Sequence, residues 1–163
     1  MKKLLLLLAL TTASFADENW FSYRYGKLGA GTLEAPHTDP GVAAGGGIRV
    51  VTGHSGVDLS VDYIEHSGSD HLILGKGLFL FFLTPGWKHS LYGGLGLGYG
   101  RLKNEGHNFV GLFGEGVIGY ALITHTRVLA FVEAGIHQPA IPTGSPTVIY
   151  RQPAATLTFG VGF

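Results

Sequence analysis

The sequence contains no cysteine, which excludes the disulfide-stapled scaffolds common among small secreted proteins. Charged residues are sparse, at 13% of the chain, and 11 basic residues balance 11 acidic ones. They form no basic run or patch, so we expect no nucleic-acid partner. The chain is nevertheless rich in Leu, Val, Phe and Tyr, so its composition is not that of a disordered protein.

A long apolar segment is also missing. The most apolar internal run, LILGKGLFLFFL at 72–83, contains Lys76 and two glycines. It is shorter than the ~20 residues that a membrane-spanning helix needs. We predict a strand there instead, with a bulge that leaves its two faces poorly separated.

The N-terminal stretch MKKLLLLLALTTASFA has the layout of a secretory signal peptide. Two lysines precede an apolar run from Leu4 to Leu10, and small residues occupy Ser14 and Ala16, the two positions that a signal peptidase reads. The alternative, a membrane anchor, needs a much longer apolar run. We therefore expect a leader at 1–16, cleavage after Ala16, and one exported domain at 17–163.

Glycine, by contrast, is abundant at 27 residues, and the remaining pattern alternates with period two. In VDLSVDY (57–63), apolar residues alternate with Asp, Ser and Asp, and other segments repeat this pattern. Such alternation is typical of strands with one apolar and one polar face. We predict about eight strands, at 20–31, 42–51, 56–65, 72–83, 91–101, 109–122, 128–137 and 154–163.

The connections between these strands alternate in length. Short ones are expected at 52–55, 84–89 and 123–127, and longer ones at 32–41, 64–71, 102–108 and 138–153. This arrangement is typical of outer-membrane barrels, whose short turns are periplasmic and whose long loops face outside. The alternative is a lipocalin-like soluble barrel, which would need a charged, water-exposed outer face. Gly94, Gly96, Gly98 and Gly100 suit such a face poorly, but they would make room inside a narrow barrel.

The chain ends TLTFGVGF, with one apolar face formed by Leu157, Phe159, Val161 and Phe163. Together with the leader and the eight amphipathic strands, this ending resembles the Gram-negative outer-membrane proteins of the OmpA/OmpX/opacity-like type. The resemblance implies an all-β, transmembrane, antiparallel up-and-down barrel in the Gram-negative outer membrane. It also implies that these four residues are a signal for the barrel-assembly machinery. The expected surroundings are outer-membrane lipid and lipopolysaccharide, and the expected state is a monomer.

The opposite strand faces place a set of charges inside the barrel. We expect a luminal ion network of Arg24, Arg49, Asp58, Asp62, Lys76, Glu115 and Glu133, because buried charges need partners. An ion pathway or porin is disfavoured, since eight strands leave no open pore. If TGHS (52–55) is a four-residue turn, Arg49 lies opposite Asp58. We further expect Glu115 and Glu133 to approach each other diagonally, with Arg24 or Lys76 as counter-ion.

The eight histidines show no metal-ligand spacing, so we expect no metal and no cofactor. His137 stands apart, because it ends a predicted strand near Glu133 and Ser145. These residue types resemble those of barrel enzymes that deacylate lipid A, although the His-x-Ser-Asn run of those enzymes is missing. We therefore expect a non-enzymatic protein, with a structural or surface-interaction role carried by its outer loops and no catalytic residue. The alternative is an outer-membrane enzyme that acts on lipid A or phospholipid.

Overall fold

A computed structural model describes residues 20–35, 39–66, 70–85, 89–123, 129–143 and 152–163. The expected leader at 1–16 and its cleavage site lie outside these ranges. Within them, no helix has the length and apolar character needed to cross a bilayer.

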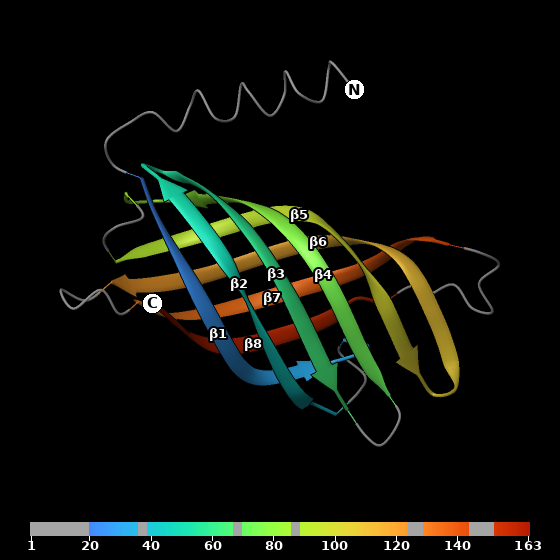
Figure 1. The fold of residues 1–163 in the computed structure, drawn as a ribbon. Helices are drawn as coiled ribbons and strands as arrows, with labels where there is room; N and C mark the ends of the chain where they lie inside the picture. Colours follow the sequence, from blue (N-terminus) through green and yellow to red (C-terminus); the bar gives the residue numbers. More distant parts are fainter. Residues whose placement is uncertain (1–19, 36–38, 67–69, 86–88, 124–128, 144–151) are drawn as a thin grey trace, which may run out of the picture.

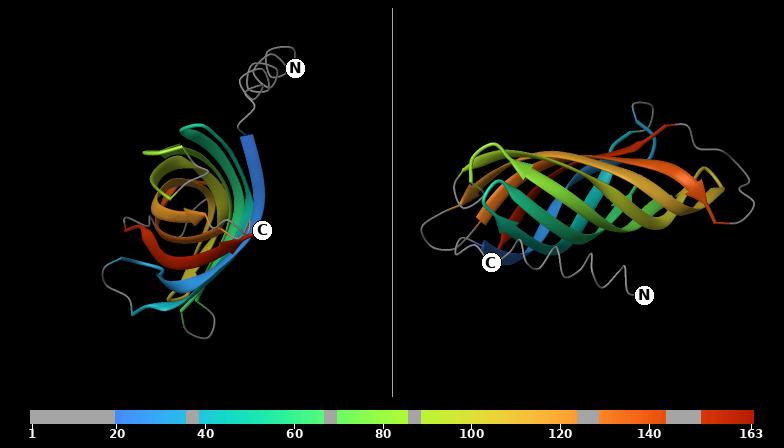
Figure 2. Two further views of the ribbon diagram at one scale, coloured as in Figure 1. Left: turned by 90° about the vertical axis from the view of Figure 1, so that its left-hand side faces the viewer. Right: turned by 90° about the horizontal axis from the view of Figure 1, so that it is seen from above.

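Eight antiparallel strands form one closed barrel, in which each strand pairs with its neighbours in sequence and β1 pairs with β8 (Figures 1 and 2). This arrangement confirms the predicted all-β, antiparallel, up-and-down barrel. The strands are β1 (Trp20–Thr32), β2 (Gly41–Thr52), β3 (Ser55–Glu65), β4 (His71–Phe82), β5 (Ser90–Asn104), β6 (His107–Ile123), β7 (Leu129–Pro142) and β8 (Ala154–Gly162). The barrel closes through its last residue, because the backbone N–H groups of Arg24 and Phe163 each donate to the carbonyl of the other, at 3.0 and 2.9 Å.

The connections between strands define the two ends of the barrel. One end, called the turn end below, carries Trp20, Phe163 and the connections 53–54, 83–89 and 124–128. The other, called the loop end, carries the connections 33–40, 66–70, 105–106 and 143–153.

The expectation of a longer loop at 102–108 is wrong. Asn104 pairs with His107, so only Glu105 and Gly106 connect β5 to β6. Both residues have positive φ, of 50° and 79°, as a tight hairpin turn with the twist of its strands requires.

The bulge expected in 72–83 is also absent, because β4 pairs with both neighbours without a shift. Its inward and outward residues alternate cleanly, with Lys76 buried inside and the neighbouring glycines outside. The register shift lies instead between β6 and β7, where Phe113 pairs with Pro139 and Leu112 with Ile141. Proline has no N–H to give to the ladder, so strand prolines are tolerated at such bulges.

Apolar side chains fill both ends of the lumen. At the turn end, a first cluster comprises Tyr23, Tyr25, Val51, Leu78, Leu80, Phe82, Tyr92, Val117, Ala121, Leu129 and Phe131. At the loop end, a second cluster comprises Leu33, Ala43, Ile64, Leu72, Leu74, Leu102, Phe109, Phe113 and Ala154. Glycines make room for the larger rings: Tyr92 lies over Gly119, and Phe131 over Gly160. The polar residues described next lie between these two apolar plugs.

Candidate functional site

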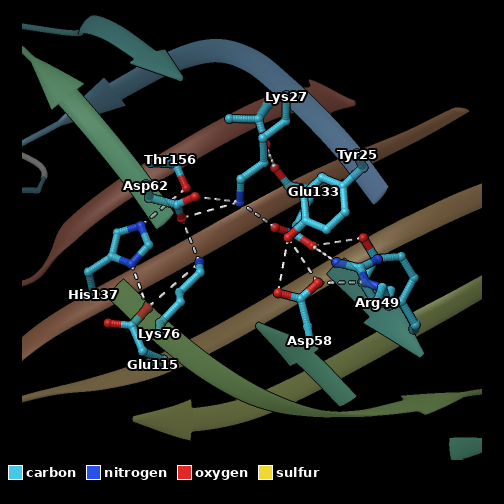
Figure 3. A network of polar contacts seen from close by, with 12 residues as sticks. Tyr25, Lys27, Arg49, Asp58, Asp62, Lys76, Glu115, Glu133, His137 and Thr156 are labelled. Carbon is cyan, nitrogen blue, oxygen red and sulfur yellow. Dashed lines mark hydrogen bonds and ion pairs between the residues drawn. The ribbon is translucent and has the colours of Figure 1, made fainter. Parts of the chain in front are cut away.

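A chain of ionisable groups of alternating sign runs through the lumen (Figure 3). Strand alternation turns each of these side chains inward, and all of them are buried. In order, the contacts are Asp58–Arg49 at 2.8 Å, Arg49–Glu133 at 2.9 Å, Glu133–Lys27 at 2.9 Å, Lys27–Asp62 at 3.1 Å, Asp62–Lys76 at 2.6 Å, Lys76–Glu115 at 3.8 Å and Glu115–His137 at 2.6 Å. We call this set the ion chain.

The turn-end half of the ion chain is built around Arg49, whose side chain is fully buried. Arg49 pairs directly with Asp58 across β2 and β3, which confirms the predicted register. The guanidinium carbon lies 5.2, 4.8 and 5.2 Å from the ring centroids of Tyr25, Tyr92 and Phe131. Such contacts between a cation and aromatic faces strengthen when water is excluded.

Two tyrosine hydroxyls donate to the carboxylates of this half. Tyr25 donates to both carboxylate oxygens of Asp58, at 2.9 and 3.0 Å. Tyr92 donates to Glu133 at 2.8 Å. Both carboxylates therefore have a neutral donor as well as a cation, which lowers the cost of burying them.

The placement of Arg24 in the lumen is wrong, because its side chain is exposed on the outer face. The odd-numbered residues Tyr23, Tyr25 and Lys27 of β1 point inward instead. The aromatic residues of β1 suggested a lipid-facing side, but buried tyrosines also suit a lumen that offers acceptors for their hydroxyls. Lys27, which the sequence reasoning missed, continues the same odd-numbered series, whereas Leu28 continues the outward one.

Lys27 occupies the middle of the ion chain. Its ammonium lies between Glu133 of β7 and Asp62 of β3, and so joins the two halves of the network. Asp62 in turn meets Lys76 of β4. These contacts reach across the lumen rather than along one hairpin, so the ion chain ties separate parts of the wall together.

The loop-end half finishes at His137, which is fully buried. Its Nδ1 lies 2.6 Å from Glu115 and its Nε2 lies 3.4 Å from the hydroxyl of Thr156. The expected diagonal approach of Glu115 and Glu133 is wrong, because Glu115 pairs with His137 and Glu133 with Gly119, four residues along β6. Lys76 is the counter-ion of Glu115, as expected, whereas Lys27 and Arg49 are the counter-ions of Glu133.

A carboxylate, an imidazole and a hydroxyl in this order can pass a proton, as acyl-transfer sites do. However, the side chains of Glu115, His137 and Thr156 are all buried, below the apolar plug of the loop end. Ser145, the hydroxyl considered from the sequence, lies outside the described residues. Among the described residues, no group of three or more His, Asp or Glu side chains is placed to hold a metal ion.

The ion chain contains three basic residues, Lys27, Arg49 and Lys76, against four carboxylates. Each carboxylate contacts at least one of these cations at 3.8 Å or less. The arrangement joins strands to one another across the lumen through buried ion pairs.

The four apolar residues near the C-terminus all lie on the outer face. Leu157, Phe159, Val161 and Phe163 are exposed, while the residues between them are buried. They form an apolar ridge along the strand that closes the barrel against β1. Their role as an assembly signal stays a prediction.

Comparison with known proteins identifies the fold. No protein-family model matches the chain, and no curated protein matches it. The crystal structure of Neisserial surface protein A (NspA) is similar, with a TM-score of 0.64 and 9% identity over 88% of this chain and 95% of that one. The Yersinia pestis outer membrane protein Ail, solved in a phospholipid bilayer nanodisc, aligns over 88% of this chain and all of its own with a TM-score of 0.45 and 12% identity. The likeness to NspA shows a shared fold, in agreement with the barrel type that the sequence resembles.

Proposed function

We propose that this protein is an integral barrel of the Gram-negative outer membrane, with a filled lumen and a non-enzymatic role. One observation carries the proposal: the wall is apolar outside and charged inside. Every strand exposes a large aliphatic side chain, namely Leu28, Ile48, Leu59, Ile73, Leu97, Ile118, Val132 and Leu157. A barrel in water would have the opposite arrangement, since contiguous apolar surface of this extent is rare on soluble monomers.

The height of this apolar belt suits a bilayer. On β5, the outward residues from Leu91 to Tyr99 are Leu, Gly or Tyr, and Arg101 follows. Eight steps correspond to ~27 Å along the strand, or about 20 Å along the membrane normal at the usual tilt of membrane barrels. The apolar band of such barrels is ~25 Å tall. The belt therefore covers most of the acyl region.

A filled lumen argues against a solute channel. The two apolar plugs and the ion chain between them use the interior that eight strands enclose. We assign the function to the surface instead: outer-membrane lipid and lipopolysaccharide around the belt, and structural or surface contacts through the loop-end connections. Recognition of Leu157, Phe159, Val161 and Phe163 by the barrel-assembly machinery, and a monomeric state, belong to the same proposal.

Cell fractionation tests the location. The protein should be found in the outer membrane, begin at Asp17, and migrate faster on a gel before boiling than after it, as closed barrels do. A folded protein recovered from the soluble periplasmic fraction would refute the proposal. Reconstituted protein should also give no conductance steps in planar bilayers, and steady steps would refute the filled lumen.

Lipid A spectra test the non-enzymatic role. The residues that could form an acyl-transfer site, Glu115, His137 and Thr156, are closed off from lipid. Mass spectra of lipid A from cells with and without the protein should therefore be identical. Loss of an acyl chain that depends on the protein, and that His137→Gln abolishes, would establish the hydrolase alternative.

A further inference from the structure

Charged residues are unevenly distributed on the outer face of the wall. Across the described strands, Arg24 is the outward charge at the turn end. At the loop end, the outward charged residues of the described strands are Glu65 on β3 and Arg101 and Lys103 on β5, whereas the outward positions of the other strands there carry no charge. One sector of the loop end is therefore cationic next to the apolar belt.

Arg101 and Lys103 are the core of this sector. Both point outward from β5, two residues apart, so their side chains start ~7 Å from each other. Arg101 Nε donates to Asn108 Oδ1 at 2.9 Å, which orients the guanidinium and uses one of its five donors. Lys103 lies opposite His71 on β4 and opposite Asn108 on β6.

The outward side chains change from apolar to cationic along β5. The outward side chains of β5 are apolar up to Tyr99, then cationic at Arg101 and Lys103. The acidic residues of the adjoining connections, Asp70 and Glu105, lie farther toward the loop tips, where Asp70 Oδ2 accepts the backbone N–H of Glu105 at 3.2 Å. On β5, the boundary between the belt and water thus favours an anion.

Among the strand residues, Glu65 is the outward carboxylate nearest to Lys103. It pairs with His71, so one strand separates it from Lys103, and the ring of His71 stacks on Tyr63 with centroids 6.2 Å apart. Near Arg101, the outer surface of β4 is recessed because two of its outward residues are glycines without side chains. Gly75 lies opposite Tyr99, and Gly77 lies opposite Leu97. An acyl chain lying against these residues would place its head group at the two cations.

We propose that Arg101 and Lys103 form a docking site for the phosphate group of an outer-leaflet lipid. The inference rests on the proposed membrane location, because the belt must hold the acyl chains. Arg and Lys both bind phosphate oxygens, and the guanidinium can do so in a bidentate manner. The tyrosine at the belt edge, Tyr99, then lies at the level of the ester groups.

The test uses nanodiscs of phosphatidylcholine that contain either bisphosphorylated lipid A or lipid A without phosphates. Native mass spectrometry counts the lipid A retained on the released protein. The intact protein should retain the phosphorylated form preferentially. Arg101→Gln combined with Lys103→Gln should reduce this preference roughly thirtyfold, since each cation near an anionic lipid surface contributes roughly fivefold.

Arg24→Gln is the matched control, because it removes an exposed arginine at the opposite end of the barrel, and the preference should be unchanged. Equal retention of both lipids by the intact protein, or an equal loss in Arg24→Gln, would overturn the site. Displacement of lipid A by inorganic phosphate alone would show an anion site that does not need the lipid, and it would overturn the assignment to a lipid. Failure of the intact protein to enter nanodiscs would instead refute the proposed membrane location, so the two failures are distinguishable.

Discussion

Replacing Asp58 with alanine tests how much the ion chain stabilises the barrel. Asp58 accepts hydrogen bonds from Arg49 at 2.8 Å and from the Tyr25 hydroxyl at 2.9 Å, and all three side chains are buried. Alanine removes the charge and both bonds at once. The rings of Tyr25, Tyr92 and Phe131, all members of the first apolar cluster, pack against Arg49 of this pair.

The expected cost follows from these contacts. Removing one partner of a buried ion pair costs about 3–5 kcal/mol. Arg49 keeps Glu133 at 2.9 Å, so the lower end of that range applies. The Tyr25 hydroxyl loses its acceptor, which adds about 1 kcal/mol. We expect the free energy of unfolding to fall by about 4 kcal/mol.

Urea unfolding in lipid vesicles, followed by gel mobility without boiling, measures this change. Asp39→Ala is the control, because Asp39 is an exposed loop carboxylate and its removal should cost less than about 0.5 kcal/mol. Arg49→Met completes a double-mutant cycle, in which the double variant should be more stable than the sum of the single effects by about 2 kcal/mol. Equal unfolding midpoints for Asp58→Ala and Asp39→Ala would refute the reasoning.

Three further predictions concern the wall. Gly96→Ala should block folding or strongly destabilise the barrel, because its Cβ would meet the backbone of Gly77. The Cβ of Gly77→Ala would meet only a Leu59 methyl at 3.4 Å, so this variant should fold. The refolding yields of the two variants test the difference. Leu97→Arg should cost about 2–4 kcal/mol in urea unfolding, the cost of a cation in mid-bilayer. Phe159→Asp should reduce the amount of assembled barrel in cells, although the exposed charge of Arg24 is tolerated. Normal assembly of Phe159→Asp would contradict an assembly role for the terminal strand.

The strands were predictable because their signal is local. Apolar and polar residues alternate with period two wherever one face meets lipid and the other the lumen. The turn around Gly53 then fixes the register of β2 and β3, and with it the Arg49–Asp58 pair, since a slip of one residue would turn one of the two charges outward. Pattern and turn length agree there, which is why the prediction succeeded.

The rest of the ion chain was harder to predict, because the alternation of residue types does not decide which of its residues point into the lumen. Tyrosine suits both lipid and a polar lumen, so the pattern of β1 predicted Arg24 inside the barrel and missed Lys27. The pairing of Glu115 with His137 needed the register of β6 and β7, whose connection at 124–128 gives no short-range constraint. Contacts across the lumen, such as Lys27 with Asp62, depend on barrel closure and have no signal in a single sequence.

The central claim, that the apolar face of the barrel lies in lipid, is tested most directly by spin labels on the outer wall. The chain has no cysteine, so single cysteines introduced at Leu59, Leu97 and Leu157 can be labelled without background. In reconstituted bilayers, these labels should be relaxed by oxygen, which partitions into lipid, and shielded from a water-soluble nickel complex, whereas a label at Glu65 should show the reverse. Strong relaxation by the nickel complex at Leu97 and Leu157 would contradict the account.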